Sequence, residues 1–151
     1  MPARLGFALL LGLVVLAACD GLAPSIATRE GQPATLAGTA WRVVSVEGRT
    51  PVAGGAPTIA FDASKVSGSS GCNFFSGAYR YDGASGEIGF DNLGMTARAC
   101  AEAARNEFET RFSQALVQAN LVSVDAEGRL TLGGPGGAIV LEVDPQRAVE
   151  G

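Results

Sequence analysis

Residues 101–119 read AEAARNEFETRFSQALVQA, and this segment decides the fold because it holds no glycine or proline in a chain with 21 glycines. Its apolar side chains recur at intervals of four, four, four and three, which is the period of an amphipathic helix. The apolar positions are Ala104, Phe108, Phe112, Leu116 and Ala119. The predicted outward face carries Glu102, Arg105, Asn106, Glu109 and Gln118. We therefore expect one helix whose apolar stripe lies on a sheet.

Short strand-like segments flank this helix on both sides, separated by turns rich in glycine and proline. Before the helix, the predicted strands cover residues 41–46, 58–61, 65–68, 77–81 and 87–90. After it, they cover residues 122–124, 129–132 and 138–143, with a glycine-rich turn at 133–137. A phosphate-binding loop is the alternative for this turn, but its proline and the strand that follows favour a hairpin. The order of strands, helix and strands predicts one domain of the α+β class.

The N-terminus has the order of an export signal, with Arg4 followed by an uncharged apolar run from Leu5 to Ala18. The run is shorter than the roughly 20 residues that a membrane-spanning helix needs. The sequence Leu16-Ala17-Ala18-Cys19 at its end resembles the lipobox of a bacterial lipoprotein signal peptide. We expect residues 1–18 to be a signal peptide and Cys19 to carry the lipid. The alternative is an ordinary secretory signal in which Cys19 is incidental.

The rest of the chain divides into three parts. Residues 19–36 contain Pro24, Pro33 and small polar residues without an apolar period, which predicts a flexible tether. Residues 37–144 form the predicted domain, and residues 145–151 a C-terminal tail. A lipid on Cys19 anchors the chain to the membrane of the bacterial envelope, facing the periplasm. Asp20 after that cysteine weakly favours the inner membrane, and the outer membrane stays open.

Cysteine usage agrees with export, because the chain has three cysteines and lipidation of Cys19 leaves an even pair. In an exported protein, the pair Cys72 and Cys100 predicts a disulfide. Closing the loop between them removes roughly 3 to 4 kcal/mol of unfolded-state entropy. A redox-active or metal-binding pair is the alternative, but the spacing is not Cys-x-x-Cys and the chain has no histidine. We therefore expect no metal site.

Charge and composition exclude several classes of function. The chain carries 11 basic and 15 acidic residues without a basic cluster, which argues against nucleic acid as a partner. The absence of histidine removes the Ser-His-Asp triad and the usual general base, so we expect no enzyme and no cofactor. Asp82, Glu87 and Asp91 are interpreted as solvated turn residues, with a glycosidase-type carboxylate pair as the alternative.

An ordered set of motifs resembles the META domain, the HslJ-like family of bacterial envelope lipoproteins. The motif residues that match are Gly71, Cys72, Asn73, Gly77, Met95 and Thr96, and the opening Leu36-x-Gly38-Thr39-x-Trp41 fits the first strand of the family. The resemblance covers residues 36–143. It implies an antiparallel, partly open barrel-like sheet with one amphipathic helix packed on it. It implies no catalytic residue, and it suggests a link to envelope stress tolerance.

Two motif regions have both a structural and a functional interpretation. We expect Asn73 to satisfy backbone groups in its turn, with Phe74 and Phe75 seating that turn on the core. Contact with a ligand is the alternative. Trp41 is expected in the core or at its rim, with the lining of a cleft as the alternative.

Two hypotheses for the function remain. The first is a noncatalytic, membrane-tethered envelope module that binds an envelope protein, a peptide or an apolar, lipid-like ligand through its sheet face or barrel mouth. The second is a small inhibitor or regulator of periplasmic enzymes such as proteases, which uses an exposed loop such as residues 49–58.

Overall fold

The computed structural model describes residues 31–146, which form eight strands and one helix. Their bounds are β1 (Thr39–Val46), β2 (Thr58–Phe61), β3 (Lys65–Ser69), β4 (Phe74–Tyr81), β5 (Ile88–Met95), α1 (Ala103–Val117), β6 (Leu121–Val124), β7 (Leu130–Gly134) and β8 (Gly137–Val143). The predicted signal peptide, Cys19 and most of the predicted tether lie outside the described residues, as does the end of the tail. Within residues 31–146, α1 falls short of the length and apolarity needed to span a membrane.

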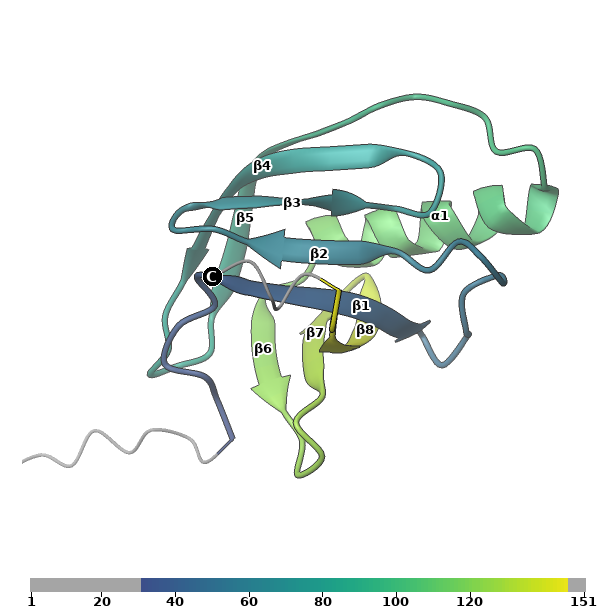
Figure 1. Cartoon of the computed structure of the whole chain (residues 1–151). Helices are drawn as coiled ribbons and strands as arrows, with labels where there is room; N and C mark the ends of the chain where they lie inside the picture. The colour runs from purple at the N-terminus through teal and green to yellow at the C-terminus, as the bar shows by residue number, and fades with distance from the viewer. Residues whose placement is uncertain (1–30, 147–151) are drawn as a thin grey trace, which may run out of the picture.

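All eight strands belong to one antiparallel sheet with the order β5-β4-β3-β2-β1-β8-β7-β6. The sheet curls until its two edge strands approach each other, as Figure 1 shows. A single bridge joins Glu87 to Leu121 at that seam, and Val122 N–H donates to Gly86 O at 2.7 Å. The predicted α+β class, with a partly open barrel and one helix, is confirmed.

The core lies between the sheet and α1, which packs mainly over β8, β1 and β7. Phe112 of α1 is fully buried, and its ring centroid lies 5.8 Å from that of Phe75 on β4. Leu132 and Ile139 complete the same cluster from β7 and β8. Burial of each such side chain contributes roughly 1.5 to 3 kcal/mol, so the inside of the curled sheet is a packed core. Trp41 belongs to this core, as predicted, and its Nε1–H donates to Thr39 Oγ1 at 2.8 Å.

The helix differs from its prediction at two positions. Ala104 is exposed near the beginning of α1, although the apolar period placed it on the sheet. Glu109, predicted to point outward, is buried at 9% exposure. Glu109 lies three residues before the buried Phe112, so both share one side of the helix. A carboxylate is tolerated there because hydrogen-bond donors from the β3–β4 turn meet it.

The end of the predicted tether is also corrected, because residues 32–36 contact the domain. Gln32 Nε2 donates to Val122 O at 3.1 Å, and Tyr81 Oη donates to Pro33 O at 2.7 Å. Leu36 is fully buried in the core. At the beginning of this segment, Val124 N–H donates to Gly31 O at 2.9 Å. These contacts hold the described start of the chain beside the end of β6.

Candidate functional site

The predicted disulfide is confirmed at the end of the sheet where β3 turns into β4. It joins Cys72 in that turn to Cys100 in the segment between β5 and α1, with 5.8 Å between the Cα atoms. The two residues are 28 positions apart in the chain. The bridge therefore links two segments that no strand pairing connects directly.

Asn73 is the hydrogen-bonding centre of this region and is only 3% exposed. Its Nδ2 donates to both carboxylate oxygens of Glu109, each at 2.9 Å, and to Arg98 O at 2.9 Å. Its Oδ1 accepts from the hydroxyl of Thr96 at 3.0 Å and from Arg98 N–H at 2.7 Å. One side chain thus ties the β3–β4 turn to both the helix and the segment after β5. Asn73 thus has a structural role, but the prediction that its side chain satisfies backbone groups of its own turn is wrong, because the backbone groups that it bonds belong to Arg98.

Glu109 is the residue that the sequence prediction missed. Besides the Asn73 side chain, its carboxylate accepts hydrogen bonds from the hydroxyl of Ser70 and from Asn73 N–H at 3.1 Å. The ion pairs within residues 31–146 do not include Glu109. Its negative charge is therefore held by neutral donors, which is how a buried carboxylate without a counter-ion is satisfied.

The disulfide sits directly against this carboxylate. Glu109 Oε2 lies 3.5 Å from Cys72 Sγ and 3.7 Å from Cys100 Sγ. Beyond the sulfurs, a shallow groove of about 300 Å³ opens to the surface. Arg98, Ala99, Glu102 and Arg105 are among its lining residues. The bridge thus has a buried anionic side and an open side.

The motif glycines are required by close backbone approaches. Gly71 has a φ of +112°, and a Cβ there would lie 2.8 Å from Gly55 O. Gly77 sits at a register shift between β4 and β5, where a Cβ would lie 2.9 Å from Asp91 O. Larger residues at either position would push neighbouring backbone segments apart.

Met95 and Thr96 complete the same end of the sheet. Thr96 N–H donates to Phe74 O at 2.9 Å, and Phe74 N–H donates to Thr96 Oγ1 at 3.0 Å. The Sδ of Met95 accepts from the hydroxyl of Ser113 at 3.5 Å. The structure therefore brings Gly71, Cys72, Asn73, Met95 and Thr96 together, with Gly77 farther along β4.

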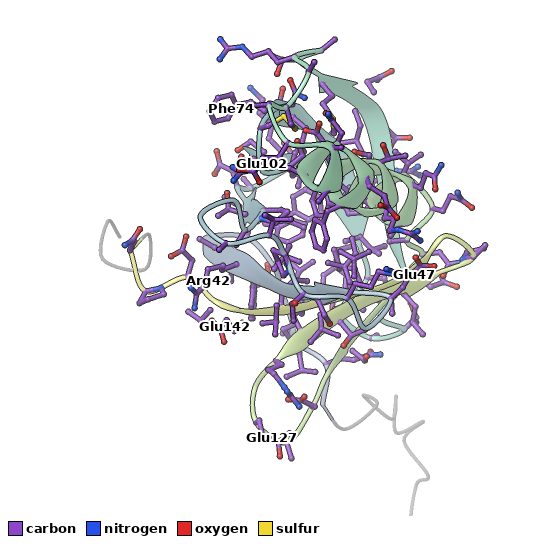
Figure 2. All side chains as sticks on the ribbon, turned by 90° about the vertical axis from the view of Figure 1, so that its right-hand side faces the viewer. Arg42, Glu47, Phe74, Glu102, Glu127 and Glu142 are labelled. Carbon is purple, nitrogen blue, oxygen red and sulfur yellow. A yellow bond between two sulfur atoms is a disulfide. The ribbon has the colours of Figure 1, made fainter. Side chains whose placement is uncertain are left out.

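Phe74 corrects the prediction that both phenylalanines seat the turn on the core. Phe75 is buried, whereas Phe74 is 64% exposed and points away from the ribbon in Figure 2. Adjacent residues of a strand face opposite sides, so only one of the two can enter the core. Phe74 therefore stands on the outer face of the sheet.

A groove of about 480 Å³ lies beside Phe74. Its remaining lining residues are mostly small, namely Thr58, Ser67, Gly68, Ser69, Phe75, Ser76, Gly94, Met95 and Thr96. The exposed residues Ser67 and Ser76 pair across β3 and β4 and alternate with buried neighbours, which places this groove on the face away from the core. We call it the Phe74 groove.

The loop at residues 49–58 is held against the domain. Arg105 Nη2 donates to Ala53 O at 3.3 Å, and Val43 N–H donates to Pro57 O at 2.9 Å. Pro57 is fully buried. The loop is therefore anchored at its middle and at its end, and its exposed residues are Arg49, Thr50, Ala53 and Gly54.

Asp82, Glu87 and Asp91, among which a catalytic carboxylate pair was the alternative, have separate roles. Asp82 accepts from Ala84 N–H at 2.8 Å and from Ser85 N–H at 3.3 Å, and these backbone bonds lower the pKa of Asp82. Glu87 is exposed beside the seam. Asp91 lies within β5, where it forms an ion pair with Arg80 at 2.9 Å. Asp82 is thus a turn residue as predicted, whereas Asp91 belongs to a strand.

These observations define a class of small α+β domains in which a curled antiparallel sheet and one helix are fastened by a disulfide. The chain belongs to the META domain family, which matches residues 34–146. A comparison with curated proteins finds no match.

Two of the solved structures that are similar to this chain are NMR structures. An NMR structure of a protein from Burkholderia xenovorans has a TM-score of 0.61 and 21% identity, and the match covers 88% of this chain and 99% of that one. A second NMR structure of a protein has a TM-score of 0.59 and 27% identity, with 72% and 91% of the two chains covered. Because the protein from Burkholderia xenovorans is only 21% identical to this chain, the likeness to it supports the fold alone.

Proposed function

We propose that the chain is a noncatalytic domain, tethered to the membrane of the bacterial envelope by a lipid on Cys19, that binds an extended segment of another envelope protein. The exposed Phe74 beside its groove carries this proposal. A large aromatic side chain that is mostly exposed beside a hollow is typical of an interaction surface. A link to envelope stress tolerance, which the family resemblance suggests, is part of the same proposal.

The shape and chemistry of the Phe74 groove favour a peptide over a lipid. Serine, threonine and glycine line most of its floor, so hydroxyl and backbone groups are within reach of a bound chain. β5, which contributes Gly94 and Met95, is an edge strand of the sheet. An edge strand offers backbone groups to an added strand, and an exposed aromatic residue offers a side-chain anchor. Packed side chains such as Phe112 occupy the inside of the sheet, which directs binding to this outer face.

The groove is tested by photo-crosslinking in intact cells. A photoreactive residue at Ser76, inside the groove, should give a protein adduct, whereas the same residue at Glu127 should not. Figure 2 shows Glu127 at the end of the domain opposite Phe74, which makes it a matched exposed control. Adducts of equal yield at both positions, or an adduct with lipid alone at Ser76, would overturn the protein partner.

The role of Phe74 itself is tested with the same probe. Phe74→Ser should lower the adduct yield at Ser76 severalfold, because the anchor is lost. The free energy of unfolding should change by less than about 0.5 kcal/mol, since the side chain is mostly exposed. An unchanged adduct yield in the folded variant would contradict the assignment of the groove.

The anchor is tested by metabolic labelling with a fatty acid. The wild-type chain should incorporate the label and begin at Cys19 after processing. Cys19→Ser should incorporate none, whereas Cys72→Ser should be labelled like the wild type. Label in the Cys19→Ser variant, or a mature chain that begins at another residue, would show that Cys19 is not the site of the lipid.

A further inference from the structure

The disulfide and Glu109 place three metal-ligating atoms in one small volume. The atoms are Cys72 Sγ, Cys100 Sγ and a carboxylate oxygen of Glu109, and all three lie within 4.8 Å of one another. Cys100 and Glu109 are buried and Cys72 is partly buried. While the disulfide is intact its sulfurs are not thiolates, and thiolates are the form in which cysteine binds metals.

The carboxylate already stands where a tetrahedral site would need it. In a zinc site with Zn–S near 2.3 Å and Zn–O near 2.0 Å, neighbouring sulfur and oxygen ligands are about 3.5 Å apart. Glu109 Oε2 lies 3.5 Å and 3.7 Å from the two sulfurs. To match this tetrahedral geometry, only the two sulfur atoms have to move. Their separation has to increase from bonding distance to about 3.8 Å.

The charges and the surroundings also suit a divalent cation. Glu109 is a buried carboxylate whose hydrogen-bond partners, Ser70 and Asn73, are neutral. Asn73 and Ser70 fix the orientation of that carboxylate, as supporting residues do around a metal ligand. Two thiolates and one carboxylate give the cluster three negative charges, which outweigh the two positive charges of the ion.

Access comes from the groove on the open side of the disulfide, which has room for a fourth ligand such as water. Two arginines line this groove. The guanidinium of Arg105 is directed to Ala53 O and Glu102, and Arg98 is exposed to solvent. Neither arginine forms an ion pair with Glu109.

We propose that reduction of the Cys72–Cys100 disulfide converts this cluster into a binding site for a thiophilic divalent metal ion such as Zn²⁺, held by Cys72, Cys100 and Glu109. A dithiol reductant supplies two electrons and two protons and is itself oxidised to a disulfide, which leaves two cysteine thiols. Metal binding then releases these two protons to solvent as both thiols become thiolates. The metal replaces the disulfide as the link between the β3–β4 turn and the segment before α1.

The test uses the full chain with Cys19→Ser, so that Cys72 and Cys100 are its only thiols. The protein is reduced with a phosphine and titrated with Zn²⁺ against a chromophoric chelator. We expect one zinc ion per reduced chain and no binding to the oxidised chain. Adding Cys72→Ser and Cys100→Ser should abolish binding in the same assay.

Glu109→Gln tests whether the carboxylate is a metal ligand or whether the two thiols bind zinc by themselves. The variant should bind zinc at least about tenfold more weakly, a loss seen even when a residue that only supports a ligand is removed. Glu102→Gln, at the rim of the same groove, should leave the affinity unchanged. Equal affinity of Glu109→Gln and the wild type would overturn the proposal.

A second measurement applies where reduction of the disulfide unfolds the chain. Zinc should raise the thermal unfolding midpoint of the reduced chain and restore its circular dichroism spectrum, with no effect on the oxidised chain. A reduced chain that stays unfolded with zinc present, or a midpoint that zinc does not change, would also overturn the proposal.

Discussion

Cys72→Ser is expected to lower the free energy of unfolding by about 3 to 4 kcal/mol, because a loop between residues 28 positions apart is no longer closed in the unfolded chain. This is a large fraction of the 5 to 15 kcal/mol that stabilises a typical domain. Urea denaturation of the oxidised wild type and the variant measures the difference.

The same bridge predicts a strongly non-additive result. Cys100→Ser should cost about as much as Cys72→Ser, and the double variant should cost little more than either one, because one bond is lost in all three. The reduced wild type provides the control, since it has both thiols and no bridge. Losses that add in the double variant would show that each cysteine acts separately.

Asn73→Asp is expected to cost about 2 to 4 kcal/mol at neutral pH. The change keeps the oxygen that accepts from Thr96 and Arg98 but removes the donor to Glu109. It also places a second carboxylate against a buried one, and two like charges at this distance oppose each other's ionisation. Thermal and urea unfolding of the variant measure the loss.

A compensating change distinguishes charge repulsion from a packing defect. Adding Glu109→Gln to Asn73→Asp should recover part of the loss, because an amide again faces a carboxylate across the same contact. A double variant that is no more stable than Asn73→Asp alone would rule out repulsion as the cause.

Much of the fold follows from local patterns. The segment 58–61 is strand β2 as predicted, and the helix follows from the period of Phe108, Phe112 and Leu116. The predicted strands at 77–81 and 87–90 were both shorter than β4 and β5. The prediction for β5 stopped before Asn92, which has a φ of +53°, and Gly94. Such residues disfavour strands locally, and pairing with neighbouring strands overrides that preference.

The candidate site was only partly predictable. An even pair of cysteines predicted the disulfide, whereas Glu109 was assigned to the outward face because charge on a helix usually faces solvent. Its partners Ser70 and Asn73 are 39 and 36 positions away in the chain, and no local pattern connects them. A signal did exist for Phe74, since two consecutive strand residues cannot both face the core.

With Cys19 lipidated as proposed, the position at which the described chain begins determines which end of the domain is tied to the membrane. Gly31 is hydrogen bonded to Val124, at the end of the domain that carries Glu127, and Phe74 stands at the opposite end (Figure 2). Residues 19–30 span at most about 40 Å when fully extended. The lipid then holds the domain by the end that carries Glu127. The end that carries Phe74 is then the end farther from the tether, and the length of residues 19–30 limits which envelope proteins Phe74 can reach.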